Sequence, residues 1–176
     1  MHDQDFLNSY FADKWDPTIE SYQYSGFAIV RKIKQDDWVL DVGCGSNPFK
    51  GKIENLVGID PANPAADIQT TLEDYQPERQ FDVALCLGSI NFGTQDIITK
   101  QIEKLNSCLA DNARVFWRLN PGLADHAHDD CNKIQFFPWT LEILWEYACK
   151  HGFCQANAKW DTNGQHNRLY AEWYRT

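Results

Sequence analysis

The turn Gly43-Cys44-Gly45 carries the clearest chemical signal in the sequence. Glycines at this spacing let the backbone turn sharply and approach a ligand without an intervening side chain. Two carboxylates flank the turn, because Asp41 lies in an apolar run just before it and Asp60 ends the next apolar run. A carboxylate accepts strong hydrogen bonds from ribose hydroxyls, which is the role we expect of Asp60. A buried carboxylate such as Asp41 is costly when unpaired, so the pattern predicts a cationic ligand or ordered backbone amides beside it.

Two further clusters of small and polar residues follow apolar runs, at Gly88-Ser89-Ile90-Asn91 and Asn120-Pro121-Gly122. Ligands of open parallel sheets bind beyond the carboxyl ends of the strands. Together with the glycine turn and Asp60, these clusters place four strand ends at one edge of the expected sheet. Their convergence predicts a binding site more specifically than any single motif does.

Short apolar runs that end at glycine or polar residues predict the buried strands of this sheet. A weaker strand is expected between the second and third of them. The runs are 38–42, 56–59, 81–87 and 113–119, and the weaker strand is 67–72.

Helical spacing of apolar residues separates these strands. The Asp16-Pro17 pair predicts the start of a helix that continues to about Lys34 and is interrupted near Gly26. Strands that alternate with helices predict a parallel sheet covered on both faces. The other expected helices span 5–15, 94–109 and 141–148.

The C-terminal part of the sequence departs from this alternation. Residues 153–160 and 168–175 both have the pattern of strands, and only a segment containing Asn163-Gly164 connects them. Such a short connection fits a hairpin and is too short for a parallel crossover. The last strand is therefore expected to be antiparallel to the rest of the sheet.

These motifs resemble those of a known family. Asp41-Val42-Gly43-Cys44-Gly45 resembles the first motif of Rossmann-like (class I) S-adenosylmethionine-dependent methyltransferases, and Gly58-Ile59-Asp60 resembles their acidic second motif. The resemblance implies an α/β, three-layer fold with a mostly parallel, seven-stranded sheet, an antiparallel last strand and added N-terminal helices. It also implies S-adenosylmethionine as cofactor and S-adenosylhomocysteine as product.

The resemblance further implies where the cofactor lies. It places the glycine turn beside the methionine portion, Asp60 on the ribose, and Leu87 and Gly88 near the sulfonium. The cofactor-binding set that it implies is Asp41, Gly43, Cys44, Gly45, Asp60, Pro61, Leu72, Glu73, Leu87 and Gly88.

Two features depart from the family pattern. The crossover from Cys44 to Asn55 has only twelve residues, so its helix is expected to be short. Family members often have an acidic residue where this chain has Thr71. Asp67, Leu72 and Glu73 therefore stay open as alternatives for the adenine contact.

A nicotinamide-dependent dehydrogenase is the main competing interpretation of the glycine turn. Such enzymes carry G-x-G-x-x-G, whereas Pro48 stands at the third glycine position here. The acidic Asp41 and the terminal hairpin also fit that class poorly.

Catalytic residues are hard to identify because methyl transfer from a sulfonium mainly requires positioning and exclusion of water. A base is needed only where the acceptor loses a proton. The long segment 120–138 carries His126 and His128, and either histidine suits a general base near neutral pH. The alternative is a hydrophilic surface loop whose histidines have no chemical role. The H-x-H-D-D spacing also permits a metal site, but no second ligand cluster accompanies it, and we expect no metal.

Residues 1–35 are expected to form a helical N-terminal cover or lid. Their aromatic rings either close over the cofactor and acceptor, where they suit a sulfonium cation, or fill the core along one sheet edge. The rings concerned are Tyr10, Phe11, Trp15, Tyr22 and Tyr24.

Charge and motifs narrow the acceptor. The net charge of −9 argues against non-specific binding to a nucleic-acid backbone. The Asn/Asp-Pro-Pro-aromatic motif of enzymes that methylate amino groups of bases or glutamine is missing after Leu87. A small molecule methylated on oxygen or nitrogen is the favoured acceptor. The alternatives are a protein or RNA substrate delivered by a partner, and a non-catalytic regulatory protein that binds the cofactor.

The length of 176 residues fits a single domain, 1–176. No apolar stretch has the length of a membrane span, and the polar start Met1-His2-Asp3 is unlike a signal peptide. The six cysteines form no C-x-x-C pair, which is typical of a reduced, cytoplasmic protein.

Overall fold

The computed structural model describes residues 3–14, 22–126, 128–162 and 166–176. Three predicted features therefore lie outside the described residues: Trp15, the helix start at Asp16-Pro17, and Asn163-Gly164 of the terminal hairpin. The strands are β1 (Trp38–Val42), β2 (Asn55–Ile59), β3 (Phe81–Leu87), β4 (Leu109–Leu119), β5 (Phe153–Asp161) and β6 (Arg168–Arg175).

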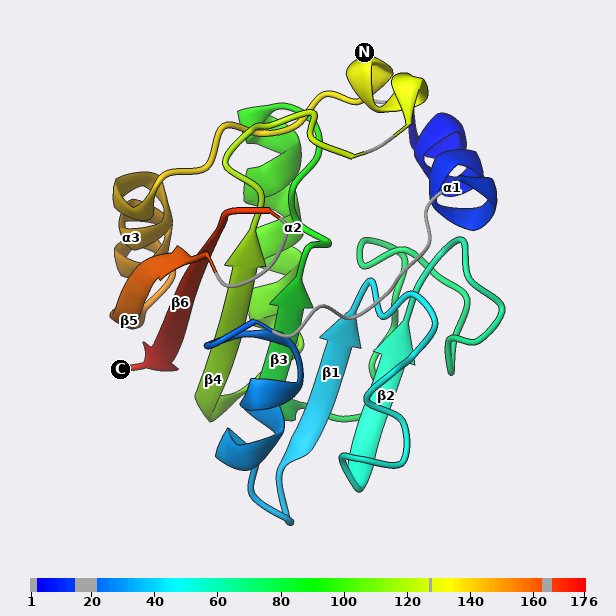
Figure 1. Cartoon of the computed structure of the whole chain (residues 1–176). Coiled ribbons are helices and arrows are strands. Elements are labelled where there is room, and N and C mark those ends of the chain that lie inside the picture. Colours follow the sequence, from blue (N-terminus) through cyan, green and yellow to red (C-terminus); the bar gives the residue numbers. More distant parts are fainter. Residues whose placement is uncertain (1–2, 15–21, 127, 163–165) are drawn as a thin grey trace.

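The strands form one sheet in the order β2-β1-β3-β4-β6-β5 (Figure 1). β1 pairs in parallel with β2 and β3, and β3 pairs in parallel with β4. β6 is antiparallel to both of its neighbours, β4 and β5. The antiparallel last strand and the α/β class predicted from the sequence are confirmed.

The sheet formed by the described residues has six strands where seven were expected. The predicted strand at 67–72 makes only an isolated bridge, between Ile59 and Ile68. The cause lies in the side chain of Asp67, which accepts a hydrogen bond from the backbone N–H of Gly58 at 2.8 Å. That N–H faces the open edge of β2, so a seventh strand would need it for its own ladder.

The described helices are α1 (Gln4–Asp13), α2 (Gln95–Ser107) and α3 (Leu141–Lys150), with the 3-10 helices η1 (Gly26–Lys32) and η2 (Asp129–Lys133). The helix expected to continue to Lys34 is thus a short 3-10 helix within the described residues. The N-cap residues Asp3 and Thr140 accept hydrogen bonds that fix the starts of α1 and α3.

The two faces of the sheet are covered unequally. On one face, α2 and α3 pack their apolar sides, including Ile98, Ile102 and Leu144, against the strands. On the other face, Ile29 of η1 and Phe49 cover the sheet. The short helix expected between Cys44 and Asn55 does not form, because those residues make turns and one bridge. Twelve residues that begin with a tight glycine turn leave too little chain for a stable helix.

The carboxyl ends of the parallel strands meet at one edge of the sheet, and α1 lies beyond that edge. Leu7 and Tyr10 of α1 pack against Cys131 and Ile134, and Figure 1 shows α1 beside the yellow segment that contains η2. The segment 120–138 therefore packs one side against α1 instead of forming a purely hydrophilic loop.

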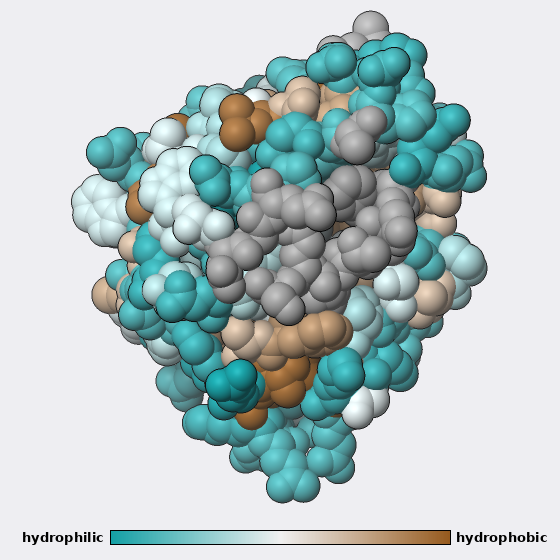
Figure 2. All heavy atoms as spheres, in the orientation of Figure 1, coloured by the Kyte–Doolittle hydropathy of each residue, from teal (hydrophilic) through white to brown (hydrophobic). Residues whose placement is uncertain are grey.

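The surface shown in Figure 2 is mostly hydrophilic, with an apolar area in the lower part of that view. Within the described part of the chain, no helix combines the length and the apolarity needed to cross a membrane. All six cysteines are free thiols.

Candidate functional site

A cavity of about 280 Å³ lies at the carboxyl-end edge of the sheet. Residues that follow β1, β2, β3 and β4 line it, and α1 closes one side. His126 also lines it, whereas His128 does not. The whole cofactor-binding set expected from the sequence lines this cavity: Asp41, Gly43, Cys44, Gly45, Asp60, Pro61, Leu72, Glu73, Leu87 and Gly88.

The glycine turn needs glycine for two separate reasons. Gly43 and Gly45 have φ angles of +67° and +54°, a region that L side chains rarely adopt. A Cβ on Gly43 would also lie 2.5 Å from the Cβ of Ser89. The backbone N–H groups of Gly43 and Cys44 both donate to the carbonyl of Ile59, at 2.8 and 3.0 Å. The turn is therefore held firmly against the end of β2.

The carboxylate of Asp60 is oriented by backbone groups. One oxygen accepts from the N–H groups of Ala62 and Asn63, both at 2.8 Å, and the other accepts from the N–H of Gly45 at 3.0 Å. A carboxylate has about four acceptor positions, so about one is left for a ligand.

Asp41 and Ser89 are two buried polar groups on the same wall of the cavity. Asp41 is 3% exposed, and its carboxylate lies at the cavity wall. Burial, followed by the negative charges of Asp60 and Asp67, raises the pKa of Asp41 to about 7. The hydroxyl of Ser89 is buried and has no hydrogen-bond partner among the described residues. Groups of this kind at a cavity wall favour a polar, positively charged ligand.

The three alternatives for the adenine contact separate clearly. Leu72 and Glu73 line the cavity, and Glu73 accepts a hydrogen bond from Gln101 at 2.7 Å. Asp67 lies outside the lining and is held by Gly58 and Lys50. The structure thus gives Asp67 a role in the edge of the sheet.

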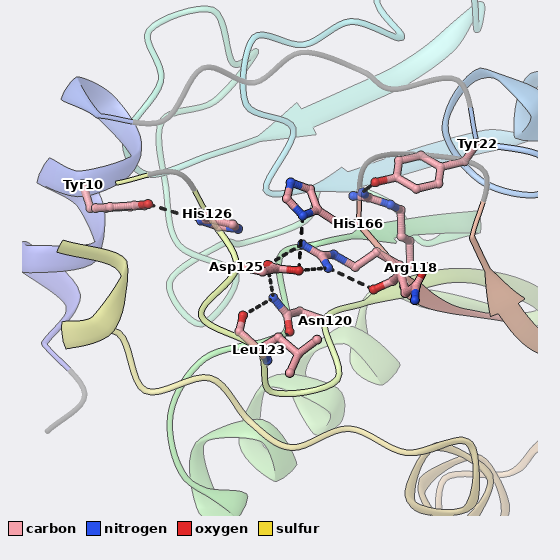
Figure 3. Close-up of polar contacts among 10 residues, drawn as sticks. Tyr10, Tyr22, Arg118, Asn120, Leu123, Asp125, His126 and His166 are labelled. Carbon is pink, nitrogen blue, oxygen red and sulfur yellow. Dashed lines mark hydrogen bonds and ion pairs between the residues drawn. The ribbon is translucent and has the colours of Figure 1, made fainter. Parts of the chain in front are cut away.

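The two histidines of the 120–138 segment have different surroundings. Nδ1 of His126 lies 3.3 Å from the hydroxyl of Tyr10 (Figure 3). Burial lowers the pKa of His126 to about 4, so its imidazole is neutral at physiological pH. Nδ1 of His128 instead accepts a hydrogen bond from the backbone N–H of Asp130 at 3.1 Å, which caps the start of η2.

The sequence motifs did not point to a charged cluster at the other end of the cavity. Both guanidinium –NH₂ groups of Arg168 donate to the carboxylate of Asp125, at 2.7 and 2.9 Å, and His166 lies 3.3 Å from the same carboxylate (Figure 3). Arg118 donates to the hydroxyl of Tyr22, with its guanidinium 4.0 Å from the centroid of that ring. Arg118 interrupts the apolar run 115–119, which is a sequence signal that marks it, whereas Arg168 begins its strand and carries no such signal.

The N-terminal aromatic rings do not act as one group. Phe11 and Tyr22 line the cavity, and Tyr10 contacts His126. Tyr24 stacks on Tyr170 at the sheet face covered by η1. Trp15 lies outside the described residues. The structure therefore places only part of the expected lid at the cavity.

The described residues contain no group of three or more His, Cys, Asp and Glu side chains arranged to hold a metal ion. His126 and His128, which the H-x-H-D-D spacing brought together in sequence, make different contacts in the fold.

Comparison with models of protein families gives no match. Comparison with curated proteins also gives no match. Solved structures match closely in fold. One is the 1,6-didemethyltoxoflavin-N1-methyltransferase of Burkholderia thailandensis with bound 1,6-didemethyltoxoflavin and S-adenosylhomocysteine (TM-score 0.75, 14% identity, covering 98% of this chain and 86% of that chain).

Two further solved structures are similar. The magnesium protoporphyrin IX methyltransferase of Synechocystis with bound S-adenosylmethionine has a TM-score of 0.71 and 14% identity, covering 100% of this chain and 98% of that chain. The N-methyltransferase NodS of Bradyrhizobium japonicum with S-adenosylhomocysteine has a TM-score of 0.66 and 12% identity, covering 98% and 97%. The chain has the fold of class I S-adenosylmethionine-dependent methyltransferases, as the sequence motifs predicted.

Proposed function

We propose that this protein binds S-adenosylmethionine in the cavity and transfers its methyl group to the oxygen or nitrogen of a small molecule. The observation that carries the proposal is the meeting of the glycine turn, the oriented Asp60 and the buried Asp41 at one wall of a cavity in this fold. The three similar structures are described as methyltransferases, each with S-adenosylmethionine or S-adenosylhomocysteine bound.

The residues present fit this cofactor. The free acceptor position of Asp60 suits a ribose hydroxyl, and Gly43 and Gly45 line the cavity where the methionine portion is expected. The positive charge of bound S-adenosylmethionine would favour the ionised form of Asp41. Leu72 and Glu73 offer an apolar face and an acceptor to the adenine.

The chemistry required of the protein is mainly placement. When bound, the cofactor supplies a methyl group whose bond to the cationic sulfur breaks, with the electron pair staying on sulfur, as the acceptor atom attacks. Leu87 and Gly88 line the part of the cavity where the sulfonium is expected, and residues of α1 line the cavity from one side and limit the access of water.

His126 is our candidate for contact with the acceptor. Its neutral imidazole can accept a hydrogen bond from an O–H or N–H group of the methyl-accepting molecule. Where that molecule loses a proton during the reaction, the imidazole can receive the proton. The low pKa makes His126 a weak base, so orientation of the acceptor is its larger contribution. His128 lies outside the cavity, and we assign it the cap of η2.

Calorimetric titration tests cofactor binding. We expect S-adenosylmethionine and S-adenosylhomocysteine to bind and NAD⁺ not to bind. Asp60→Ala should lower the affinity for S-adenosylmethionine by about tenfold to a hundredfold, because hydrogen bonds to a charged group contribute about 1.5–3 kcal/mol. Asp111→Ala, which removes an exposed carboxylate outside the cavity lining, is the matched control. Binding of NAD⁺ instead, or of neither nucleoside, would overturn the proposal.

Transfer of a radiolabelled methyl group into a metabolite extract separates an enzyme from a binding protein. Label in a small-molecule fraction supports the proposed activity, and His126→Gln should reduce it while leaving S-adenosylhomocysteine affinity unchanged. Tight cofactor binding with no label in any fraction would favour a non-catalytic regulatory protein. Label in a protein or RNA fraction would favour a macromolecular acceptor.

A further inference from the structure

An imidazole and a carboxylate face each other in the charged cluster at the end of the cavity opposite the glycine turn. Nδ1 of His166 lies 3.3 Å from Oδ2 of Asp125. Figure 3 draws this contact as a dashed line, with the other ring nitrogen of His166 turned away from Asp125. Because His166 lines the cavity, its ring connects the carboxylate to the space in which a ligand would bind.

The carboxylate of Asp125 is held in place by its other partners. The two guanidinium –NH₂ groups of Arg168 donate to its two oxygens, at 2.7 and 2.9 Å, and the side chain of Arg168 is only 5% exposed. The amide of Asn120 donates to Oδ1 at 3.5 Å. A carboxylate oxygen has two acceptor positions, so Oδ2 serves both Arg168 and His166. The imidazole therefore meets a carboxylate whose orientation is already fixed.

The sheet brings this pair close to the expected position of the methyl donor. His166 precedes β6, which lies antiparallel beside β4, with Leu119 opposite Leu169. β3, which ends just before Gly88, pairs with the other side of β4. Neighbouring strands are about 4.8 Å apart, so the start of β6 lies roughly 10 Å from the end of β3. A small molecule of one or two rings spans that distance.

A carboxylate at Nδ1 determines what the imidazole offers to a ligand. It favours the tautomer that carries its proton on Nδ1, which leaves the lone pair on Nε2. When Nε2 takes up a proton, the same carboxylate stabilises the imidazolium that forms. This arrangement of carboxylate and imidazole suits a general base.

The two imidazoles that line the cavity have different partners at Nδ1. His126 has the hydroxyl of Tyr10 there, at 3.3 Å, whereas His166 has a carboxylate. Burial, followed by charges that include those of Arg168 and His166, lowers the pKa of His126 to about 4. A base this weak orients an acceptor better than it removes a proton. The removal of a proton therefore falls to His166.

The need for a base also depends on the atom that is methylated. A neutral amine nitrogen already presents a lone pair and attacks before any proton is lost. A hydroxyl is a weak nucleophile and is activated by an adjacent general base. A cavity wall that carries a paired imidazole and carboxylate thus favours a hydroxyl oxygen.

We propose that His166, held by Asp125, is the general base of the reaction and that a hydroxyl oxygen of a small molecule accepts the methyl group. This inference rests on the proposed function and adds the proton acceptor and the methylated atom. As the oxygen attacks, the C–O bond forms and the methyl–sulfur bond breaks, with its electron pair staying on sulfur. The electron pair of the O–H bond stays on oxygen, the proton moves to Nε2, and the imidazolium later releases it to water.

The test measures the rate of radiolabelled methyl transfer into the small-molecule fraction of a metabolite extract, using the full chain at saturating S-adenosylmethionine. His166→Gln should lower this rate at neutral pH by at least about a hundredfold, the usual contribution of a general base. Its affinity for S-adenosylhomocysteine should stay within about twofold. His151→Gln, at the C-terminal end of α3 and outside the cavity lining, is the matched control. Thermal unfolding verifies that each variant is folded.

The pH profile separates a base from a structural residue. The deficit of His166→Gln should shrink as pH rises, because hydroxide then removes the proton in place of the imidazole. His126→Gln should lower the rate by a constant factor from neutral to alkaline pH, since His126 is neutral throughout that range. The other charged groups of this end, Arg118, Asp125 and Arg168, are present in both variants and affect both profiles.

Nuclear magnetic resonance tests the tautomer without any acceptor. Two-bond ¹H–¹⁵N correlation spectra of the full chain, recorded at alkaline pH, should show His166 protonated on Nδ1 and unprotonated on Nε2. A proton on Nε2 would leave no lone pair for the acceptor and would overturn the inference.

The outcomes separate the two proposals. Failure of the unmodified protein to bind S-adenosylhomocysteine contradicts the proposed function, whatever the state of His166. Methyl transfer that is unchanged in His166→Gln, or reduced by the same factor at every pH, overturns the general base and leaves the proposed function intact. Loss of S-adenosylhomocysteine affinity in His166→Gln would assign that imidazole to the cofactor and overturn the inference as well.

Discussion

The cavity half beside β1 and β2 is shaped by the backbone, whereas the charged cluster beside β4 and β6 is shaped by side chains. In the first half, N–H groups of Gly45, Ala62 and Asn63 orient one carboxylate, and the turn at Gly43 packs against Ser89 with no room for a side chain. In the second half, guanidinium, imidazole, phenol and carboxylate groups contact one another.

The two halves also differ in how far apart their residues lie in the sequence. Asp60 is 15 positions from Gly45, whereas Arg168 is 43 positions from Asp125, and Tyr10 is 116 positions from His126. A site made from neighbouring turns depends on local conformation. A site made from distant side chains depends on the whole fold, and single substitutions alter its chemistry without altering the turn.

Gly43→Ala should have the largest effect, confined to the backbone half. The added Cβ meets Ser89 at 2.5 Å, and φ of +67° is strained for alanine. We expect S-adenosylhomocysteine affinity to fall by about a hundredfold or more and the free energy of unfolding to fall by about 1–3 kcal/mol.

Gly51→Ala is the matched control for this change. Gly51 also has a positive φ, of +78°, but a Cβ there meets nothing within 4 Å. It should cost only the strain of about 1–2 kcal/mol and leave cofactor affinity unchanged. Unchanged cofactor affinity in Gly43→Ala, measured by calorimetry, would contradict the role given to the turn.

Asp125→Asn should have an intermediate effect, confined to the charged cluster. It leaves the nearly buried charge of Arg168 without its carboxylate, so we expect the free energy of unfolding to fall by about 2 kcal/mol in chemical denaturation. S-adenosylhomocysteine affinity should stay within about twofold, since the two sets of residues are separate. Asp130→Asn, which breaks the exposed pair with Lys133, should lower the free energy of unfolding far less, because solvent screens that pair. A similar cost for both variants would show that the buried pair contributes little.

The pH dependence of cofactor binding should show the smallest effect. Burial raises the pKa of Asp41 to about 7, so the cofactor-free protein holds a proton there that its unfolded chain would release. Its stability therefore declines as pH rises from the usual pKa toward about 7. A cation favours ionised Asp41, so S-adenosylmethionine should release a proton near neutral pH and bind up to about tenfold more tightly as pH increases. Calorimetry in buffers of different ionisation enthalpy measures that proton.

Asp41→Asn should abolish this pH dependence and weaken S-adenosylmethionine binding. Proton release that persists in Asp41→Asn would place the titrating group elsewhere.

Apolar runs that end at glycine or polar residues, together with the pattern of the two C-terminal segments, predicted the six strands that the described residues form. The strand predicted at 67–72 does not form, because the side chain of Asp67 accepts a hydrogen bond from the backbone N–H of Gly58. The apolar pattern does not reveal that contact. The helix expected to continue to Lys34 is instead the short 3-10 helix η1, whose side chain Ile29 packs against the sheet.

The backbone half of the cavity was predictable because the motif residues are close in sequence and their spacing fixes the geometry. The charged cluster was not, because its contacts depend on which strand β6 joins. Arg118 carries one sequence signal, because a charged residue inside an apolar strand needs a partner, as Asp41 does.

The position of β6 also sets an order of assembly during synthesis. β4 and β5 emerge from the ribosome before β6, yet β6 separates them in the finished sheet. The nascent chain must therefore keep β4 and β5 from joining each other until Arg168 and the residues after it have emerged. The turns after β1 and β2 that line the cavity precede β6 in the chain, so they emerge before Arg168 does.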